Sequence, residues 1–248
     1  MTECTVIAVW NNEEMFLEFE QQLRQQQDVK CTLLGIDNRN GTFSGIREAF
    51  NACAEQVSTE LVLFAHQDIR FLAPDSLHKL LQQLNTLGQF GVVGVAGCPA
   101  GGQWELLSTI VHGEDKKPAG KPITGPQQVQ AVDECLFAMQ TKVFRQLRFT
   151  GEKGWHLYAV EQCIRAEQAG LKNYVVPAAV YHLSDGKSLD PSYMVALRAM
   201  GRTYRLGVLN TTVKQWVFNT AGGRFYMEYY YWKQKLKQFL VRNRLLRG

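Results

Sequence analysis

The sequence predicts an α/β fold, in which a mixed, mostly parallel sheet is flanked by helices and followed by a helical C-terminal extension. Apolar, β-prone runs alternate with helical patterns from Cys4 onward, as in right-handed βαβ units. The first three runs all end in polar residues, which a parallel sheet gathers along one edge. Beyond Asp190-Pro191 the pattern becomes helical and basic.

The first half of the chain alternates regularly between the two kinds of element. Strands are expected at residues 4–10, 29–36, 60–65 and 91–97, and helices at 13–27, 44–57 and 75–87. Asn11-Asn12 can cap the first helix and Pro74 begins the third, since these residue types favour helix starts.

The second half is less regular. Residues 98–126 are rich in glycine and proline, and we expect a long loop there, with a short hairpin near 105–112. Strands are expected at 129–139 and 172–181, and helices at 141–147 and 158–169, before the natural stop Gly170. Two further helices, separated by Gly222-Gly223, are expected at the C-terminus. The predicted domain therefore covers residues 1–188, and the extension 189–248.

Composition favours a cytoplasmic protein. The 248-residue chain is 46% hydrophobic and 20% charged, which is ordinary for a soluble protein. Six cysteines without a CxxC pair indicate core thiols in a reducing compartment, not a disulfide framework or a zinc site. The N-terminus lacks a basic signal segment, and every apolar run is too short to span a membrane. Neither phosphate-binding glycine motif, GxxxxGK[ST] or GxGxxG, is present, so a nucleotide would be held in another way.

The stretch from Glu60 to Arg70 is the first candidate site. An apolar strand ends abruptly in His66 and Asp68, and open α/β sheets place their chemistry at the carboxyl ends of strands. An aspartate with a histidine can bind a divalent cation. The structural alternative is that Asp68 caps the turn before Pro74 and His66 is a buried, hydrogen-bonded histidine, since His-x-Asp alone is a weak motif.

Six segments in a fixed order resemble a known family. They are residues 6–13, 36–38, 63–68, 132–139, 155–165 and 181–182. Together they resemble the GT-A glycosyltransferases, in particular the inverting family 2 and its bacterial subgroup that has His-Gln-Asp, here His66-Gln67-Asp68, in place of the DxD motif. The resemblance covers roughly residues 4–188 and implies a GT-A fold.

The resemblance also implies a reaction. A sugar would move from a nucleotide-sugar to a hydroxyl of a glycan acceptor, with inversion, and a Mn²⁺ or Mg²⁺ ion would neutralise the leaving diphosphate. The residues that it assigns to the donor are Asn11, Asp37, Asn38, Asn51 and His66. The residues that it assigns to the metal are Asp68, His66 and His182. For Asp37, a simple turn residue is the structural alternative.

The general base departs from the family pattern. The usual aspartate falls at Ala159, and Glu161 is the nearest carboxylate, although it points about 200° away along a helix. Glu161 serves as the base in a shifted geometry, or Asp133 or Glu134 replaces it; Asp133 is equally a candidate for orienting the acceptor. A plain ion pair of Glu161 with Arg165 is the structural alternative. A non-catalytic nucleotide- or glycan-binding module and a Rossmann-like methyltransferase are the competing functions.

The C-terminal extension suggests an anionic partner. From residue 198 onward eleven basic residues stand against Glu228 alone, so this part carries about +10 and the preceding part about −6, within a net charge of +4. Its aromatic rings and cations suit a peripheral membrane helix beside a lipid-linked surface glycan. The pattern continues to Arg244, Leu245 and Leu246, which add a cation and two apolar side chains at the end. Docking on its own domain or on a second subunit of a homodimer is the alternative. Nucleic acid is not expected, since no nucleic-acid fold is recognised.

Overall fold

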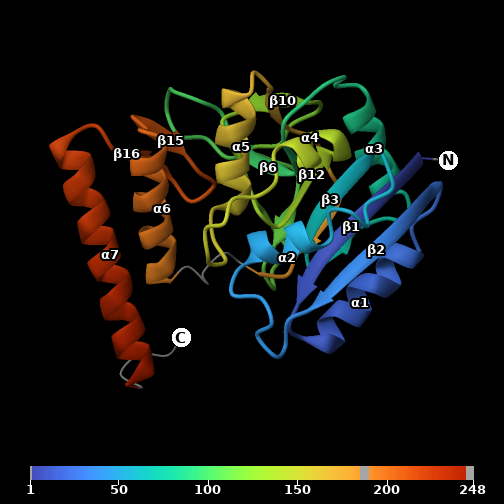
Figure 1. The fold of residues 1–248 in the computed structure, drawn as a ribbon, viewed down its shortest axis with the longest axis horizontal. Helices are drawn as coiled ribbons and strands as arrows, with labels where there is room; N and C mark the ends of the chain where they lie inside the picture. The colour runs from blue at the N-terminus through green and yellow to red at the C-terminus, as the bar shows by residue number, and fades with distance from the viewer. Residues whose placement is uncertain (1, 185–189, 244–248) are drawn as a thin grey trace.

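The computed structural model describes residues 2–184 and 190–243. A seven-stranded sheet with the order β10-β13-β5-β12-β3-β1-β2 lies at its centre, with helices on both sides (Figure 1). The strands of this sheet are β1 (Thr2–Trp10), β2 (Val29–Asp37), β3 (Leu61–His66), β5 (Val93–Gly94), β10 (Gln127–Val129), β12 (Leu136–Gln140) and β13 (Asn173–Val175). The predicted α/β class with a mixed sheet is confirmed.

Alternation along the strands separates two cores. Val6 and Leu63 face a cluster that also contains apolar residues of α1 (Glu13–Arg24) and α3 (Ser76–Asn85). Ile7 and Phe64, one residue later in each strand, face the opposite cluster, because successive strand side chains point to opposite faces. The helices of that second cluster are α2 (Ile46–Ala52), α4 (Thr141–Gln146) and α5 (Tyr158–Gln168).

Two expectations about the sheet need correction. The sheet is partly rather than mostly parallel, because β1–β2, β1–β3 and β5–β13 are parallel whereas β12 runs antiparallel to both neighbours. The runs 91–97 and 172–181 are also not single strands. Each divides between the main sheet and a small one, the second at Pro177, which cannot donate to a strand ladder.

Two small sheets border the main one. Their orders are β11-β6-β7 and β4-β14-β8-β9. Their strands are β4 (Ile69–Phe71), β6 (Ala96–Cys98), β7 (Leu107–Ser108), β8 (Val111–His112), β9 (Lys117–Pro118), β11 (Ala131–Val132) and β14 (Val180–His182). The segment 98–126 therefore contains short strands, and its hairpin, β8–β9, pairs Val111 with Pro118, later than expected.

The C-terminal part is not wholly helical. Between α6 (Pro191–Thr203) and α7 (Ala221–Arg242) lies a hairpin of β15 (Val208–Asn210) and β16 (Gln215–Val217), which the sequence reading missed. The predicted separation of two helices at Gly222-Gly223 is wrong, since both glycines belong to the first turn of α7. A side chain at Gly223 would collide with the backbone of Val217, so glycine allows α7 to pack against β16.

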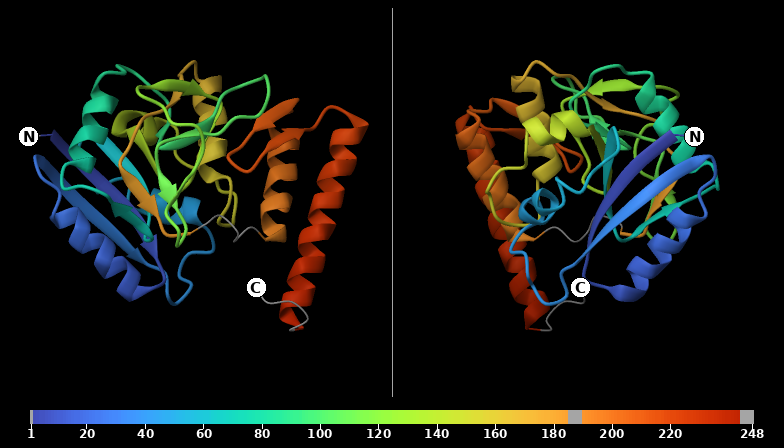
Figure 2. Two further views of the ribbon diagram at one scale, coloured as in Figure 1. Left: turned by 180° about the vertical axis from the view of Figure 1, so that it is seen from behind. Right: turned by 45° about the vertical axis from the view of Figure 1, so that its right-hand side comes forward.

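These C-terminal elements form a layer beside α5. Tyr193 and Leu197 of α6, Trp216 of β16 and Met227 of α7 share a third apolar cluster with Leu157. Helix α7 stands at the outer edge of the molecule, next to α6 and away from the main sheet (Figures 1 and 2). Within the described residues, no helix combines the length and the apolar character needed to cross a bilayer. The proposed domain boundary at residue 188 and the last residues, Arg244 to Gly248, lie outside the described residues.

Candidate functional site

The polar ends of the first three strands meet at one edge of the sheet. Trp10 is in register with Asp37, and Val9 with His66. Gln67 joins two of these ends, because its Oε1 accepts from the backbone N–H groups of Asn11 and Asn12, both at 3.1 Å, and its Nε2 donates to Asn11 Oδ1 at 2.8 Å. Gln67, the middle residue of His-Gln-Asp, therefore stabilises the strand edge. His66 and Asp68 on either side of it do not take part in these hydrogen bonds.

His66, Asp68 and His182 form a cluster at this edge. Strand β4 follows Asp68 directly and pairs with β14, so that Ile69 lies opposite His182. As a result Asp68 Oδ2 lies 3.3 Å from His182 Nε2, and Asp68 Oδ1 lies 3.9 Å from His66 Nδ1. One ligand atom from each of the three residues lies within 4.8 Å of the others.

The hydrogen bonds of the cluster favour a metal ion. Tyr158 donates its hydroxyl proton to the carbonyl oxygen of Glu134 and therefore accepts from His66 Nε2–H, 2.8 Å away. His66 Nδ1 is left with its lone pair on the side of Asp68. His182 Nε2 is buried and, among the described residues, without a hydrogen-bond partner. Two imidazole nitrogens and a carboxylate suit Mn²⁺ better than Mg²⁺, which prefers oxygen ligands.

The pKa values of the three residues in the cluster are shifted in different directions. Burial lowers the pKa of His66 and keeps this imidazole neutral, the state that binds a metal. Burial opposes ionisation of Asp68, but His182 and His66 outweigh it and hold the pKa of that carboxyl below its usual value. His182 shows the converse: burial lowers its pKa, but the Asp68 and Asp133 carboxylates outweigh that effect and raise it. A bound cation would take the place of the His182 proton.

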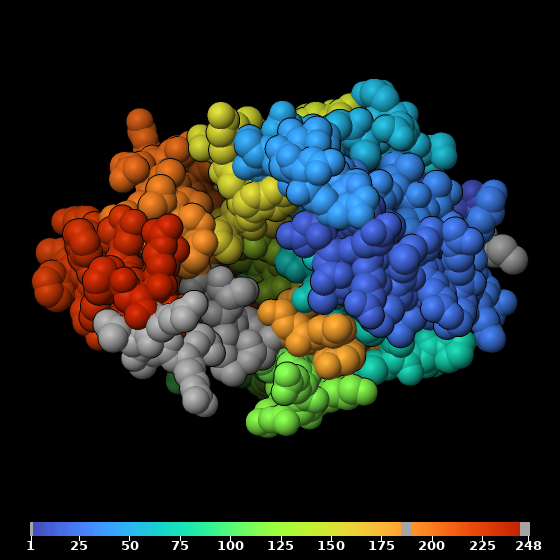
Figure 3. Space-filling model, turned by 90° about the horizontal axis from the view of Figure 1, so that it is seen from below, coloured from blue at the N-terminus to red at the C-terminus, as the bar shows by residue number. Residues whose placement is uncertain are grey.

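Two cavities meet at this cluster. One, of about 520 Å³, is lined by the ends of β1, β2 and β3 and includes Trp10, Asn11 and Asn38. The other, of about 590 Å³, is lined by residues from the middle and C-terminal parts of the chain. His66, Asp68 and Trp155 line both. Figure 3 shows a hollow from below, between N-terminal segments in blue and later segments in yellow and orange.

The other residues that were expected to bind the nucleotide-sugar do not all lie in the smaller cavity. Asn11 and Asn38 line the smaller cavity, and Asn38 also holds its loop closed, since Nδ2 donates to Phe43 O at 3.3 Å and Oδ1 accepts from Phe43 N at 2.8 Å. Asp37 is exposed and paired with Arg39 at 2.7 Å, and it is not among the residues that line either cavity. Asn51 is tied by both amide atoms to the backbone of Phe149 and thereby fixes α2 to the loop before α5.

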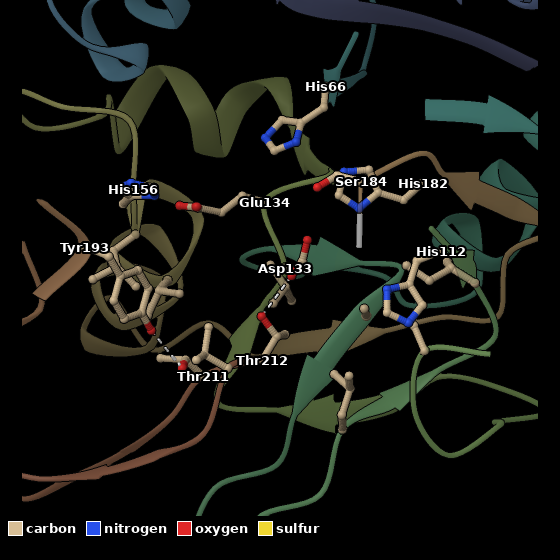
Figure 4. Close-up of a pocket in the computed structure, with 18 of the residues that line it drawn as sticks. His66, His112, Asp133, Glu134, His156, His182, Ser184, Tyr193, Thr211 and Thr212 are labelled. Carbon is tan, nitrogen blue, oxygen red and sulfur yellow. Dashed lines mark hydrogen bonds between the residues drawn. The ribbon is translucent and has the colours of Figure 1, made fainter. Parts of the chain in front are cut away.

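Besides Asp68, two further carboxylates line the larger cavity, Asp133 and Glu134 (Figure 4). Asp133 is held by the backbone N–H of Cys135 at 2.9 Å and by the hydroxyl of Thr212, in the hairpin β15–β16, at 2.8 Å. Glu134 Oε1 accepts from the backbone N–H of Tyr158 at 2.6 Å, at the start of α5. In Figure 4 the carboxylate of Glu134 points toward His156 across the cavity.

These carboxylates differ in acidity. Burial favours neutral Asp133, but His182 and the hydrogen bonds from Cys135 and Thr212 lower its pKa. Burial, reinforced by the negative charge of Asp133, raises the pKa of Glu134 to about 8. A carboxyl that exchanges a proton near neutral pH and faces a cavity has the properties of a general base.

Glu161 lies elsewhere. Its Oε2 lies 2.7 Å from Arg47 Nε and accepts from Thr150 at 2.9 Å, and its Oε1 accepts from Tyr204 at 2.9 Å. Both charged side chains of the pair with Arg47 are buried, so the expected exposed pair with Arg165 is not formed; Arg165 bonds Gln162 instead. Ala159 is fully buried in the core cluster beside the sheet.

Sequence reasoning missed several residues of the site. Tyr158 and Thr212 had no signal, because their roles depend on contacts between segments far apart in the chain. Glu134 had one, since an acidic pair between two apolar runs is unusual, and it was named only as an alternative base.

The sequence is similar to a family of known proteins. A family model described as "Glycosyltransferase like family" matches residues 5–236. A curated protein of Fuscovulum blasticum, named "ATP synthase subunits region ORF 6", is 25% identical over 194 residues, which cover 71% of this chain and 72% of that protein. That name states no activity.

Two solved structures are similar to this chain. The mannosyltransferase PcManGT from Pyrobaculum calidifontis, in complex with GDP-Man and Mn²⁺, is similar with a TM-score of 0.51 at 13% identity, over 82% of this chain and 61% of that one. S. aureus TarS, in complex with UDP-GlcNAc, gives a TM-score of 0.49 at 11% identity, over 82% and 66%. This chain therefore spans less than two thirds of the length of either structure. The GT-A type of the fold rests on the first of them.

Proposed function

The chain belongs to the glycosyltransferase-like family, and on that premise we propose that it transfers a sugar from a nucleotide-sugar donor to a hydroxyl of a glycan acceptor. The observation that carries the proposal is the meeting of two cavities at His66 and Asp68, two members of the cluster that His182 completes. A donor and an acceptor must meet in this way at the bond that is exchanged.

The smaller cavity suits the nucleotide end of the donor. Its walls are the carboxyl ends of parallel strands, where open α/β sheets bind nucleotides. Asn11 and Asn38 supply polar groups there, and Asp37 is the exposed neighbour of Asn38. His66, Asp68 and His182 would hold Mn²⁺, which supplies electrostatic stabilisation of the diphosphate leaving group when bound.

The larger cavity suits the acceptor, and Glu134 is the proposed base in place of Glu161. An acceptor hydroxyl gives its proton to Glu134 while its oxygen attacks the anomeric carbon and the bond to the diphosphate breaks. Attack from the face opposite the leaving group inverts the configuration. Asp133, fixed by Thr212, orients the acceptor. We further propose that this work takes place in the cytoplasm, with residues 1–188 as the catalytic domain.

The competing functions are weaker. The family match excludes the methyltransferase interpretation. A non-catalytic module was suggested by Ala159, but this residue lies in the core, and an aspartate there would be buried without a partner. Restoring aspartate at 159 is therefore not a useful test, whereas Glu134 lies in the cavity and can be tested directly.

The decisive experiment combines Asp68→Ala with assays of donor binding and sugar transfer. Nucleoside diphosphates and their sugars are first screened by thermal shift, because a ligand of the folded state raises stability by RT ln(1 + [L]/Kd). We expect Mn²⁺ to enhance the shift, and Asp68→Ala to abolish that enhancement and reduce transfer by ~10³-fold or more. Asp75→Ala, which removes an exposed carboxylate paired with Lys79, is the matched control. Full transfer by folded Asp68→Ala would disprove the proposal.

A further inference from the structure

Helix α7 has an apolar stripe that its own chain does not cover. Phe225, Tyr229, Trp232, Leu236 and Phe239 are each between 55% and 75% exposed. Their spacing alternates between four and three residues, so they form one continuous line along the helix. The inner face of α7, with Met227 and Tyr230, packs instead on the third apolar cluster, where Tyr230 contacts Trp216 at 5.4 Å between ring centroids.

The second half of the helix is supported least by the rest of the molecule. Every residue from Lys233 to Asn243 is exposed or half-buried. The complete helix of 22 residues is about 33 Å long, and Figures 1 and 2 show it at the margin of the molecule. An isolated segment with this many exposed rings is a poor independent helix in water, so a further surface is needed to cover the stripe.

The charges around the stripe identify that surface. Lys233 and Lys235 lie about 80° to either side of it, and Arg242 lies about 100° away. The single acidic residue of α7, Glu228, is already bonded to Arg198 at 3.1 Å. Aromatic rings with cations on both flanks match the boundary of an anionic bilayer, where rings enter the headgroup level and lysines reach phosphate groups.

We propose that α7 binds the surface of an anionic membrane through this stripe. A second copy of the chain fits less well, because pairing two such helices would bring together two surfaces of strong positive charge. Figure 3 shows α7, in red, on the same side of the molecule as the hollow between the donor and acceptor segments. If the proposed transferase function holds, the bound membrane would present a lipid-linked acceptor to that hollow.

The test is flotation of the full chain with vesicles. The probes are vesicles of phosphatidylcholine alone and vesicles with about 30% phosphatidylglycerol. We expect binding to the anionic vesicles, weakened at least about tenfold without phosphatidylglycerol or at about 1 M salt. Trp232→Ser with Phe239→Ser should weaken binding by about tenfold or more, since it removes two rings from the stripe. The matched control is Leu17→Ser on α1, which replaces another exposed apolar side chain and should change nothing.

Two results would overturn the proposal. One is that the folded chain fails to bind anionic vesicles, or binds them equally well after the double substitution. The other is that light scattering shows a dimer that the double substitution converts to a monomer, in which case the stripe is a subunit interface. Donor binding, measured by thermal shift in the absence of vesicles, should be unchanged by the double substitution. Failure of membrane binding is thereby distinguished from failure of the proposed transferase function.

Discussion

Glu134 accepts from the backbone at the start of α5 and Glu161 lies in the first turn of that helix, but their surroundings differ. Glu161 has a buried cation, Arg47, at 2.7 Å, and hydroxyl donors on both carboxylate oxygens. Glu134 has one close backbone donor, a carboxylate neighbour in Asp133 and a cavity in front of it. The first environment surrounds the carboxylate with hydrogen-bond donors, whereas the second raises the pKa of the Glu134 carboxyl to about 8. We therefore assign Glu161 a structural role and propose the chemical role for Glu134.

Glu134→Gln tests the chemical side of this contrast with the largest expected effect. The amide keeps the size of the side chain and can still accept from Tyr158 N–H, but it cannot take a proton. We expect kcat for transfer to fall by ~10²–10⁴-fold with donor affinity unchanged. Steady-state kinetics with saturating Mn²⁺ measures this fall in kcat. Glu161→Gln, which makes the same change at the other glutamate, is the matched comparison. A nearly normal rate in Glu134→Gln, with loss in Asp133→Asn, would move the base to Asp133.

Glu161→Ala tests the structural side. Removing this carboxylate leaves Arg47 buried and unpaired, which should lower the free energy of unfolding by about 3–5 kcal/mol. Urea denaturation measures the loss, and Glu167→Ala, at an exposed position of the same helix, should cost little. The folded fraction of Glu161→Ala should retain transfer activity. A variant that is stable but inactive would instead assign the base to Glu161.

The pH dependence of transfer gives the smallest of these effects. Because the pKa of Glu134 is raised to about 8, most Glu134 is protonated at neutral pH and cannot accept a proton. We expect kcat/KM to rise about tenfold per pH unit at low pH and to level off above about pH 8. Measurements at constant Mn²⁺ saturation, from weakly acidic to alkaline pH, should show this rise. The residual activity of Glu134→Gln should not rise with pH in this way. If the rise persists in this variant, a group other than Glu134 causes it.

Much of the fold could be read from local patterns. The first three strands, their helices and the polar edge at Asn11, Asp37 and His66 follow from periodicity and from the rules for parallel sheets. The hairpin β15–β16 could not be read, because its strands have three residues each and are surrounded by helical patterns. The direction of β12 was also beyond local patterns, since periodicity does not distinguish parallel from antiparallel pairing.

The site divides in the same way. Sequence placed His66 and Asp68 together because they are two residues apart on a strand end, and the register of β4 with β14 brings His182 to them. The role of Glu161 was harder to predict, because its surroundings depend on Arg47, 114 residues away in the chain. Asn51 shows the same limit, since its amide bonds a backbone 98 residues away. Contacts with residues far away in the chain therefore decide whether a polar side chain takes part in chemistry or stabilises the fold.

Tyr158 contacts both Glu134 in the larger cavity and His66 in the metal-binding cluster. Its backbone N–H holds Glu134 at 2.6 Å, and its hydroxyl lies 2.8 Å from His66 Nε2. The separation between Glu134, the proposed proton acceptor, and His66, a proposed metal ligand, is therefore set by the length of one rigid aromatic side chain. A molecule with a cation-binding group and a basic group joined by a stiff spacer of matching length would engage both ends at once. Selectivity of such an inhibitor would depend on that spacer more than on either group.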